Sequence, residues 1–142
     1  MNSTETKLIN SEFKRDFDFS NPNYFKASDK EDKEFGIDFW VFNIPVAYRK
    51  RRIFCPSDIT IRFRRNSGAK TEYIKILEGS FKAELFVFEF ADKIIFSNLE
   101  SIKKALLNHQ FTTFPNPDKE TWLAAIKLEN IKHFEWKKTN EI

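Results

Sequence analysis

Glycine, cysteine and histidine are scarce in this sequence: 142 residues include three glycines, one cysteine and two histidines. With so few glycines, a loop that cradles a nucleotide phosphate is hard to build. The sequence contains no P-loop, no Gly-rich dinucleotide turn and no Gly-x-Ser-x-Gly elbow. These absences argue against kinases, NTPases and dehydrogenases.

The single cysteine, Cys55, cannot form an internal disulfide, which agrees with a reducing compartment. The two histidines, His109 and His133, are too far apart along the chain for the usual ligand spacing of a structural zinc site. Hard oxygen ligands from Asp and Glu are therefore the metal-binding groups that this composition offers.

Long apolar runs are also missing. The N-terminal segment has no apolar core of the kind found in signal peptides, and no stretch approaches the roughly 20 apolar residues that span a bilayer. We therefore expect an intracellular, cytoplasmic protein with no membrane partner.

Aromatic residues, in contrast, are abundant. Seventeen phenylalanines contribute to 41% apolar and 16% aromatic residues, which is enough material for one packed core. No linker or repeat divides the chain. We expect a single domain over residues 1–142, with its core at about residues 4–136 and a frayed C-terminal tail.

The order of hydrophobic patterns predicts an α+β fold with a central mixed sheet, an N-terminal helix and a helix after the core strands. The expected helices cover residues 4–17, 29–34 and 97–108, and residues 72–77 form either a short strand or a helical turn. The expected strands cover residues 37–42, 46–53, 58–65, 83–90, 94–96, 111–114 and 121–128.

Two helix starts carry a capping-box pattern, Ser28 with Glu31 and Ser97 with Glu100. The strand at 58–65 alternates apolar and polar residues. This alternation predicts that Arg62 and Arg64 share one exposed face.

Charge is unevenly distributed. Seven basic residues lie within a short stretch: Arg49, Lys50, Arg51, Arg52, Arg62, Arg64 and Arg65. The segment before them is acidic. A metal-dependent enzyme acting on a phosphate backbone needs such a pairing of charges, and two salt-bridging surface strands show it as well.

Asp38 stands in the apolar run Gly-Ile-Asp-Phe-Trp-Val, where an unpaired buried carboxylate is costly. The two-residue period of a hairpin places Asp38 on the face that carries Arg49 and Arg51, if the faces of the two strands coincide. Asp38 must then have a cation, a metal ion or water as its partner. A salt bridge to either arginine is the structural alternative to a metal ligand.

The segment Asp32–Arg52, an acidic helix followed by a strand with Asp38 and a hairpin ending in Ala47-Tyr48-Arg49, resembles the core of small PD-(D/E)XK nucleases. The resemblance implies a restriction-endonuclease-like fold and a deoxyribonuclease of phage or mobile-element type that pairs as a homodimer. Arg49 occupies the position of the family's lysine, and Ala47 stands where the family has an acidic residue.

The resemblance also implies a site for Mg²⁺ or Mn²⁺. Asp38 would be the first ligand, with Asp32 or Glu31 added from the preceding helix. Since the family's acidic residue can migrate, Glu72 could supply a further carboxylate and Lys75 a cation. The catalytic candidates are thus Asp38, Arg49, Asp32, Glu72 and Lys75, and the metal ligands Asp38, Asp32 and Glu72.

Three functional hypotheses follow. The first is a metal-dependent nuclease that binds DNA through the seven basic residues listed above. The second is a non-catalytic nucleic-acid-binding module on the same fold, in which Ala47 marks a lost metal site. The third is a structural component of a phage or mobile-element assembly that binds no nucleic acid. Trp40 and Tyr48 could stack on bases, but the ring-rich composition favours core packing.

Overall fold

The computed structural model describes residues 24–53 and 56–138, and the α+β class predicted from the sequence is confirmed there. The expected helix at 4–17 lies outside the described residues. The elements are β1 (Tyr24–Lys26), α2 (Asp29–Phe35), β2 (Phe39–Val41), β3 (Ile44–Lys50), β4 (Asp58–Arg65), α3 (Glu72–Glu78), β5 (Leu85–Glu89), β6 (Lys93–Asn98), α4 (Leu99–Leu107), β7 (Thr112–Pro115), β8 (Thr121–Lys127), the 3₁₀ helix η2 (Leu128–Asn130) and β9 (His133–Lys137).

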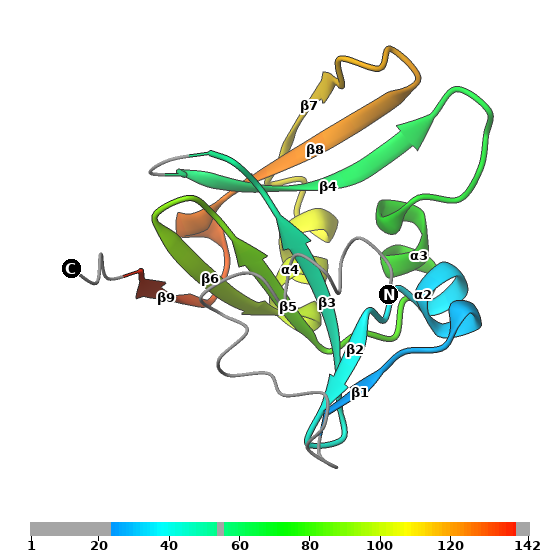
Figure 1. The fold of residues 1–142 in the computed structure, drawn as a ribbon. Helices are drawn as coiled ribbons and strands as arrows, with labels where there is room; N and C mark the ends of the chain where they lie inside the picture. Colours follow the sequence, from blue (N-terminus) through cyan, green and yellow to red (C-terminus); the bar gives the residue numbers. More distant parts are fainter. Residues whose placement is uncertain (1–23, 54–55, 139–142) are drawn as a thin grey trace.

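The larger of two sheets has six strands in the order β1-β2-β3-β5-β6-β9. It is mixed, because β3 pairs with β5 in parallel whereas every other neighbouring pair is antiparallel. A parallel pair needs a long crossover, and here β4 and α3 lie in that connection. The central mixed sheet expected from the sequence is therefore present (Figure 1).

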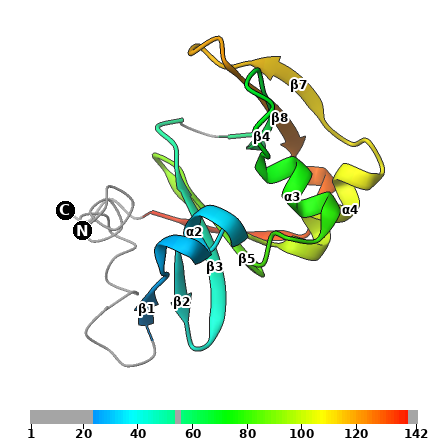
Figure 2. The same cartoon turned by 90° about the vertical axis from the view of Figure 1, so that its right-hand side faces the viewer.

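A second, antiparallel sheet has the order β4-β8-β7. It lies at one end of the molecule, with α3 and α4 beneath it (Figure 2). Both sheets contribute to one core, since Ile61 and Ala124 of the small sheet join the cluster that holds Phe86 and Phe88 of the large sheet and Ile102 of α4. This core covers one face of the large sheet.

The opposite face of the large sheet carries a smaller cluster that includes Phe39, Tyr48 and Val87. Both faces of β5 are therefore buried, as expected from its continuous apolar run. The segments β1 and β9, which form the two edges of this sheet, were not predicted. Within the described residues, no helix combines the length and the apolar character needed to cross a membrane.

Local signals set the ends of α2. Ser28 Oγ accepts a hydrogen bond from Glu31 N at 3.2 Å, and Glu31 Oε1 accepts one from Ser28 N at 2.8 Å, so the first predicted capping box is confirmed. Gly36 ends the helix in the left-handed conformation with φ of 71°. This cap turns the chain towards Asp38.

The second predicted capping box is wrong. The N-cap of α4 is Asn98, whose side chain accepts from Ser101 N at 2.7 Å. Ser97 remains in β6, where its buried hydroxyl donates to Lys132 O at 2.8 Å. Tertiary pairing with the segment before β9 therefore extends the strand by one residue beyond the start predicted for the helix.

The ambiguous segment at 72–77 is a helix, α3. Tyr73, Ile76 and Leu77 have helical spacing and face the main core, with Ile76 buried. The hairpin between β2 and β3 is confirmed, but its turn is earlier than expected: Phe42 and Asn43 have positive φ angles of 50° and 66°, and Pro45 already belongs to β3.

Candidate functional site

Three of the predicted catalytic residues form one chain of ion pairs. Arg49 Nη1 lies 2.8 Å from Asp38 Oδ2, and Arg49 Nη2 donates to Glu72 Oε2. The carboxylates are largely buried, with side-chain exposures of 9% for Asp38 and 12% for Glu72. Arg49 therefore bridges two carboxylates that come from different elements.

The hairpin positions Asp38 in this chain. Asp38 precedes β2, its backbone N–H donates to Val46 O at 2.8 Å, and its Oδ2 accepts the backbone N–H of Tyr48 at 2.7 Å. Asp38 and Arg49 share a face of the hairpin, as the two-residue period predicted. Their salt bridge was the structural alternative to metal binding.

The surroundings shift the pKa of each member. Burial raises the pKa of Asp38 to about 6, because its effect exceeds the lowering by Arg49 and by the Tyr48 N–H. The nearby Asp32 carboxylate adds to the rise. Burial acts to raise the pKa of Glu72 too, but Arg49 and the Arg62 N–H hold it below its usual value. Burial would lower the pKa of Arg49, whereas Glu72 and Asp38 raise it above its usual range.

Asp38 should make the folded state less stable as the pH rises. Its folded pKa of about 6 exceeds its ordinary value of 3.8, so the stabilisation is present at low pH and is lost as the pH rises through about 6. Integrating the linkage gives a fall of about 1.5 kcal/mol in the free energy of unfolding between about pH 4.5 and about pH 6.

Urea unfolding of the wild type and of Asp38→Asn across this range measures the effect. The variant should lack the fall that Asp38 contributes. Glu72 has the opposite effect, because its pKa is lowered in the folded state. Its stabilisation is lost only as the pH falls below 4.5, the ordinary pKa of this side chain, and this is outside the pH range of the test. Equal pH profiles for the two proteins would contradict a raised pKa at Asp38.

The other two catalytic candidates lie at the rim. Asp32 is exposed on α2, close enough to Asp38 to affect its ionisation. Lys75 Nζ donates to Lys33 O, which ties α3 to α2. Both residues line a cavity of about 390 Å³ above the ion-pair chain, together with Lys33, Gly36, Arg49, Arg62, Arg65, Lys70, Thr71, Glu72 and Phe81. We call this cavity the cleft.

This arrangement does not fit a bound Mg²⁺ or Mn²⁺. Both oxygens of Glu72 already accept hydrogen bonds, one from Arg49 and one from Arg62 N at 3.1 Å, and the guanidinium of Arg49 lies between Glu72 and Asp38. In the described part of the chain, no group of three or more His, Cys, Asp or Glu side chains could hold a metal ion. Hard cations need several free oxygen ligands around one point.

A β-bulge decides where the arginines of β4 point. Arg62 pairs with Leu123, Arg64 with Trp122 and Arg65 with Thr121, so the register shifts at Phe63. The prediction that Arg62 and Arg64 share a face is therefore wrong, because Leu123 and Trp122 are adjacent residues on opposite faces of β8.

The bulge is held by the start of α3. Thr71 Oγ1 donates to Phe63 O at 2.8 Å, and Glu72 Oε1 accepts Arg62 N. These two bonds satisfy backbone groups that the irregular ladder leaves unpaired. Glu72 thus links the bulge to Arg49, which gives it a structural role beside the predicted catalytic one.

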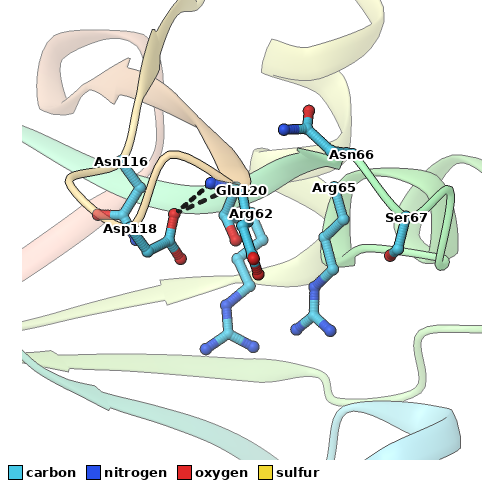
Figure 3. A pocket seen from close by; sticks show the side chains of 8 residues that line it. Arg62, Arg65, Asn66, Ser67, Asn116, Asp118 and Glu120 are labelled. Atoms are coloured by element: carbon cyan, nitrogen blue, oxygen red, sulfur yellow. Dashed lines mark hydrogen bonds between the residues drawn. The ribbon is translucent and has the colours of Figure 1, made fainter.

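As a result, Arg62 and Arg65 share a side of the sheet and line the cleft. Figure 3 shows both guanidinium groups pointing the same way from β4. Among the described residues, neither guanidinium has a hydrogen-bond partner or an ion pair, and Arg65 Nε is a buried donor without a partner. Two unpaired arginines at the mouth of a cleft form an anion-binding arrangement.

Two of the remaining members of the basic group lie beside this pair. Arg49 lines the cleft in its contacts with Asp38 and Glu72. Burial, followed by the charges of Arg49 and Arg62, lowers the pKa of Arg51, whose Nη1 donates to Lys50 O at 3.2 Å. The others do not join them. Lys50 lies on the opposite face of the sheet, where its Nζ is 3.8 Å from Glu89 Oε2. Arg52 is exposed, and Arg64 lies over the ring of Trp122, 5.0 Å from its centroid. The seven predicted nucleic-acid contacts therefore do not form one strip.

A second buried charge was missed by sequence reasoning. Glu89 is 1% exposed and accepts hydrogen bonds from the Tyr48 hydroxyl and from Lys138 Nζ, the latter at 2.8 Å. Burial and the interaction with Glu89 raise the pKa of Tyr48 above its usual range. The sequence feature that could have revealed this buried charge is a glutamate inside the apolar run Leu-Phe-Val-Phe-Glu-Phe. This cluster stabilises the face opposite the cleft.

The expectation that Trp40 and Tyr48 pack in the core is confirmed. Tyr48 is buried, and Trp40 packs against the main core while its Nε1 donates to Glu31 Oε2 at 3.1 Å.

The chain matches no family model, no curated protein and no solved structure. Function is therefore inferred from the geometry.

Proposed function

We propose that this protein binds nucleic acid, with DNA the first candidate, by holding the phosphate backbone in the cleft. The observation that carries the proposal is the side-by-side placement of Arg62 and Arg65 at the cleft, with no salt bridge to either guanidinium group among the described residues. Arginine recognises phosphate oxygens with two parallel hydrogen bonds, and such contacts position a protein on the strand.

The surroundings of the pair support an anionic ligand. Lys33, Lys70 and Lys75 also line the cleft, and the carboxylate of Glu72 is neutralised by Arg49. Lysines near a phosphate raise affinity through charge and make it salt-dependent. The mixed sheet and the Asp38–Arg49 pair are compatible with a PD-(D/E)XK-like ancestry, in which the arginine at the lysine position stabilises carboxylates rather than a metal site.

A fluorescence anisotropy titration with labelled single- and double-stranded DNA and RNA at several salt concentrations tests this function. We expect salt-dependent binding. Arg62→Ala and Arg65→Ala should each weaken it about five- to tenfold and lower the salt slope by about one. Arg64→Ala, on the other face of β4, is the matched control and should bind like the wild type. Absence of salt-dependent binding to every probe would reject the function and favour an assembly role.

Metal-dependent phosphodiester hydrolysis, which the family resemblance implies, is the alternative function, and the guanidinium of Arg49 between Asp38 and Glu72 argues against it. The test is cleavage of labelled DNA and RNA in Mg²⁺ or Mn²⁺. Cleavage that Asp38→Asn abolishes, and that Asp29→Asn on the exposed first turn of α2 leaves intact, would establish a nuclease. Binding without cleavage supports the first proposal.

A further inference from the structure

A second hollow adjoins the cleft at the end of the β4–β8 pair, where Arg65 lies opposite Thr121. It has a volume of about 660 Å³, within the range of sites that bind small molecules. We call it the tip pocket (Figure 3). Its lining residues are Arg62, Arg65, Asn66, Ser67, Asn116, Asp118, Glu120 and Thr121. Because Arg62 and Arg65 line both hollows, a ligand can extend from one into the other.

The turn between β7 and β8 is firmly held, so the tip pocket is preformed. Asp118 Oδ1 accepts the backbone N–H groups of Glu120 and Thr121, each at 2.9 Å, and these bonds lower the pKa of Asp118. Asn66 donates two hydrogen bonds to this turn, from Nδ2 to Lys119 O at 3.1 Å and from its backbone N–H to Glu120 O at 2.9 Å. Preformed sites lose little entropy on binding.

The charged groups of the tip pocket divide into donors and acceptors. Arg62 and Arg65 donate, and the buried Nε of Arg65 still needs an acceptor. Beside them, Glu120 offers a carboxylate that has no partner among the described residues. A carboxylate only accepts hydrogen bonds. The complementary ligand thus carries an anionic acceptor group next to a group with adjacent N–H donors.

We propose that the tip pocket holds one guanine nucleotide of a single strand bound in the cleft, with its phosphate on Arg62 and Arg65 and its base on Glu120. Guanine has two adjacent N–H donors on its Watson–Crick edge and can meet both oxygens of one carboxylate. Adenine has one donor and one acceptor there, cytosine has one donor and two acceptors, and thymine has a single donor between two acceptors. Single strands expose this edge for reading.

This inference rests on the proposed function and adds a base preference to it. The probes are short thymidine oligonucleotides with one central guanine, adenine, cytosine or thymine. We expect wild type to bind the guanine probe about tenfold more tightly than the others, because hydrogen bonds to a charged group contribute a difference in affinity of about this size. Glu120→Gln should reduce this preference to about twofold or less, whereas Arg65→Ala should weaken all four probes alike.

Glu84→Gln is the matched control, since it makes the same change of charge at an exposed position before β5. It should keep the preference for guanine. Equal binding of all four probes by wild type, or a full preference in Glu120→Gln, would overturn the tip pocket as a guanine site and leave the phosphate-binding function standing. Failure of wild type to bind any probe in this series or in the titration above would overturn both.

Discussion

Arg49→Ala should lower the free energy of unfolding by about 3–5 kcal/mol, the usual cost of removing one partner from a buried ion pair. Arg49 is the only cation that contacts both Asp38 and Glu72 among the described residues. Without it, two carboxylates with exposures of 9% and 12% lose their counter-charge. This loss is a large fraction of the about 5–15 kcal/mol by which a typical domain is stable.

Urea or guanidinium unfolding measures the loss, and Arg64→Ala is the control. Arg64 is exposed and its ring contact with Trp122 is worth about 0.5–1 kcal/mol. A second test combines Arg49→Ala with Asp38→Asn and Glu72→Gln. Because the uncompensated charges are then gone, the triple variant should be more stable than Arg49→Ala alone. A loss at Arg49 no larger than at Arg64 would show that the ion-pair chain contributes little.

Gly36→Ala should destabilise the protein by about 2–4 kcal/mol, for two additive reasons. Gly36 has a φ of 71°, where a side chain costs about 1 kcal/mol. A β-carbon there would lie 2.0 Å from Cε2 of Phe81, a buried ring stacked on Phe86. Moving a ring in a packed core costs about 1–3 kcal/mol. The chain continues from Gly36 to Asp38, so the cleft should be disturbed as well.

Gly68→Ala separates the two causes. Gly68 has a similar φ of 80°, but a β-carbon there meets no atom within 4 Å. This control should lose about 1 kcal/mol, the cost of the backbone conformation alone. Thermal or chemical unfolding of both variants gives the comparison. Equal losses at the two glycines would mean that Phe81 moves aside without cost and that the contact with Gly36 is not a constraint.

Predictions from local patterns were successful where neighbouring residues decide the structure. The capping box of Ser28 and Glu31 starts α2 as expected, since each residue binds the other's backbone within one turn. Strand β4 has the expected bounds. The spacing of Ile102, Ala105 and Leu106 correctly predicted the buried face of α4.

The salt bridge between Asp38 and Arg49 could also be anticipated, because the hairpin period and the cost of a buried carboxylate both come from adjacent segments. Glu72 was named as a migrated carboxylate from the family resemblance. Its contact with Arg49 required the crossover from β3 to β5, which brings α3 to this face of the sheet.

Sequence alone thus determined the α+β class, most of the elements and the need of Asp38 for a compensating partner, since these depend on periodicity, on local hydrogen bonds and on the cost of a buried carboxylate. Only the tertiary structure decided which arginines reach the cleft. The bulge at Phe63 arises from hydrogen bonds to Thr71 and Glu72, and one extra residue reverses every side chain beyond it. No pattern within β4 carries that information, because the partners that hold the bulge belong to another element.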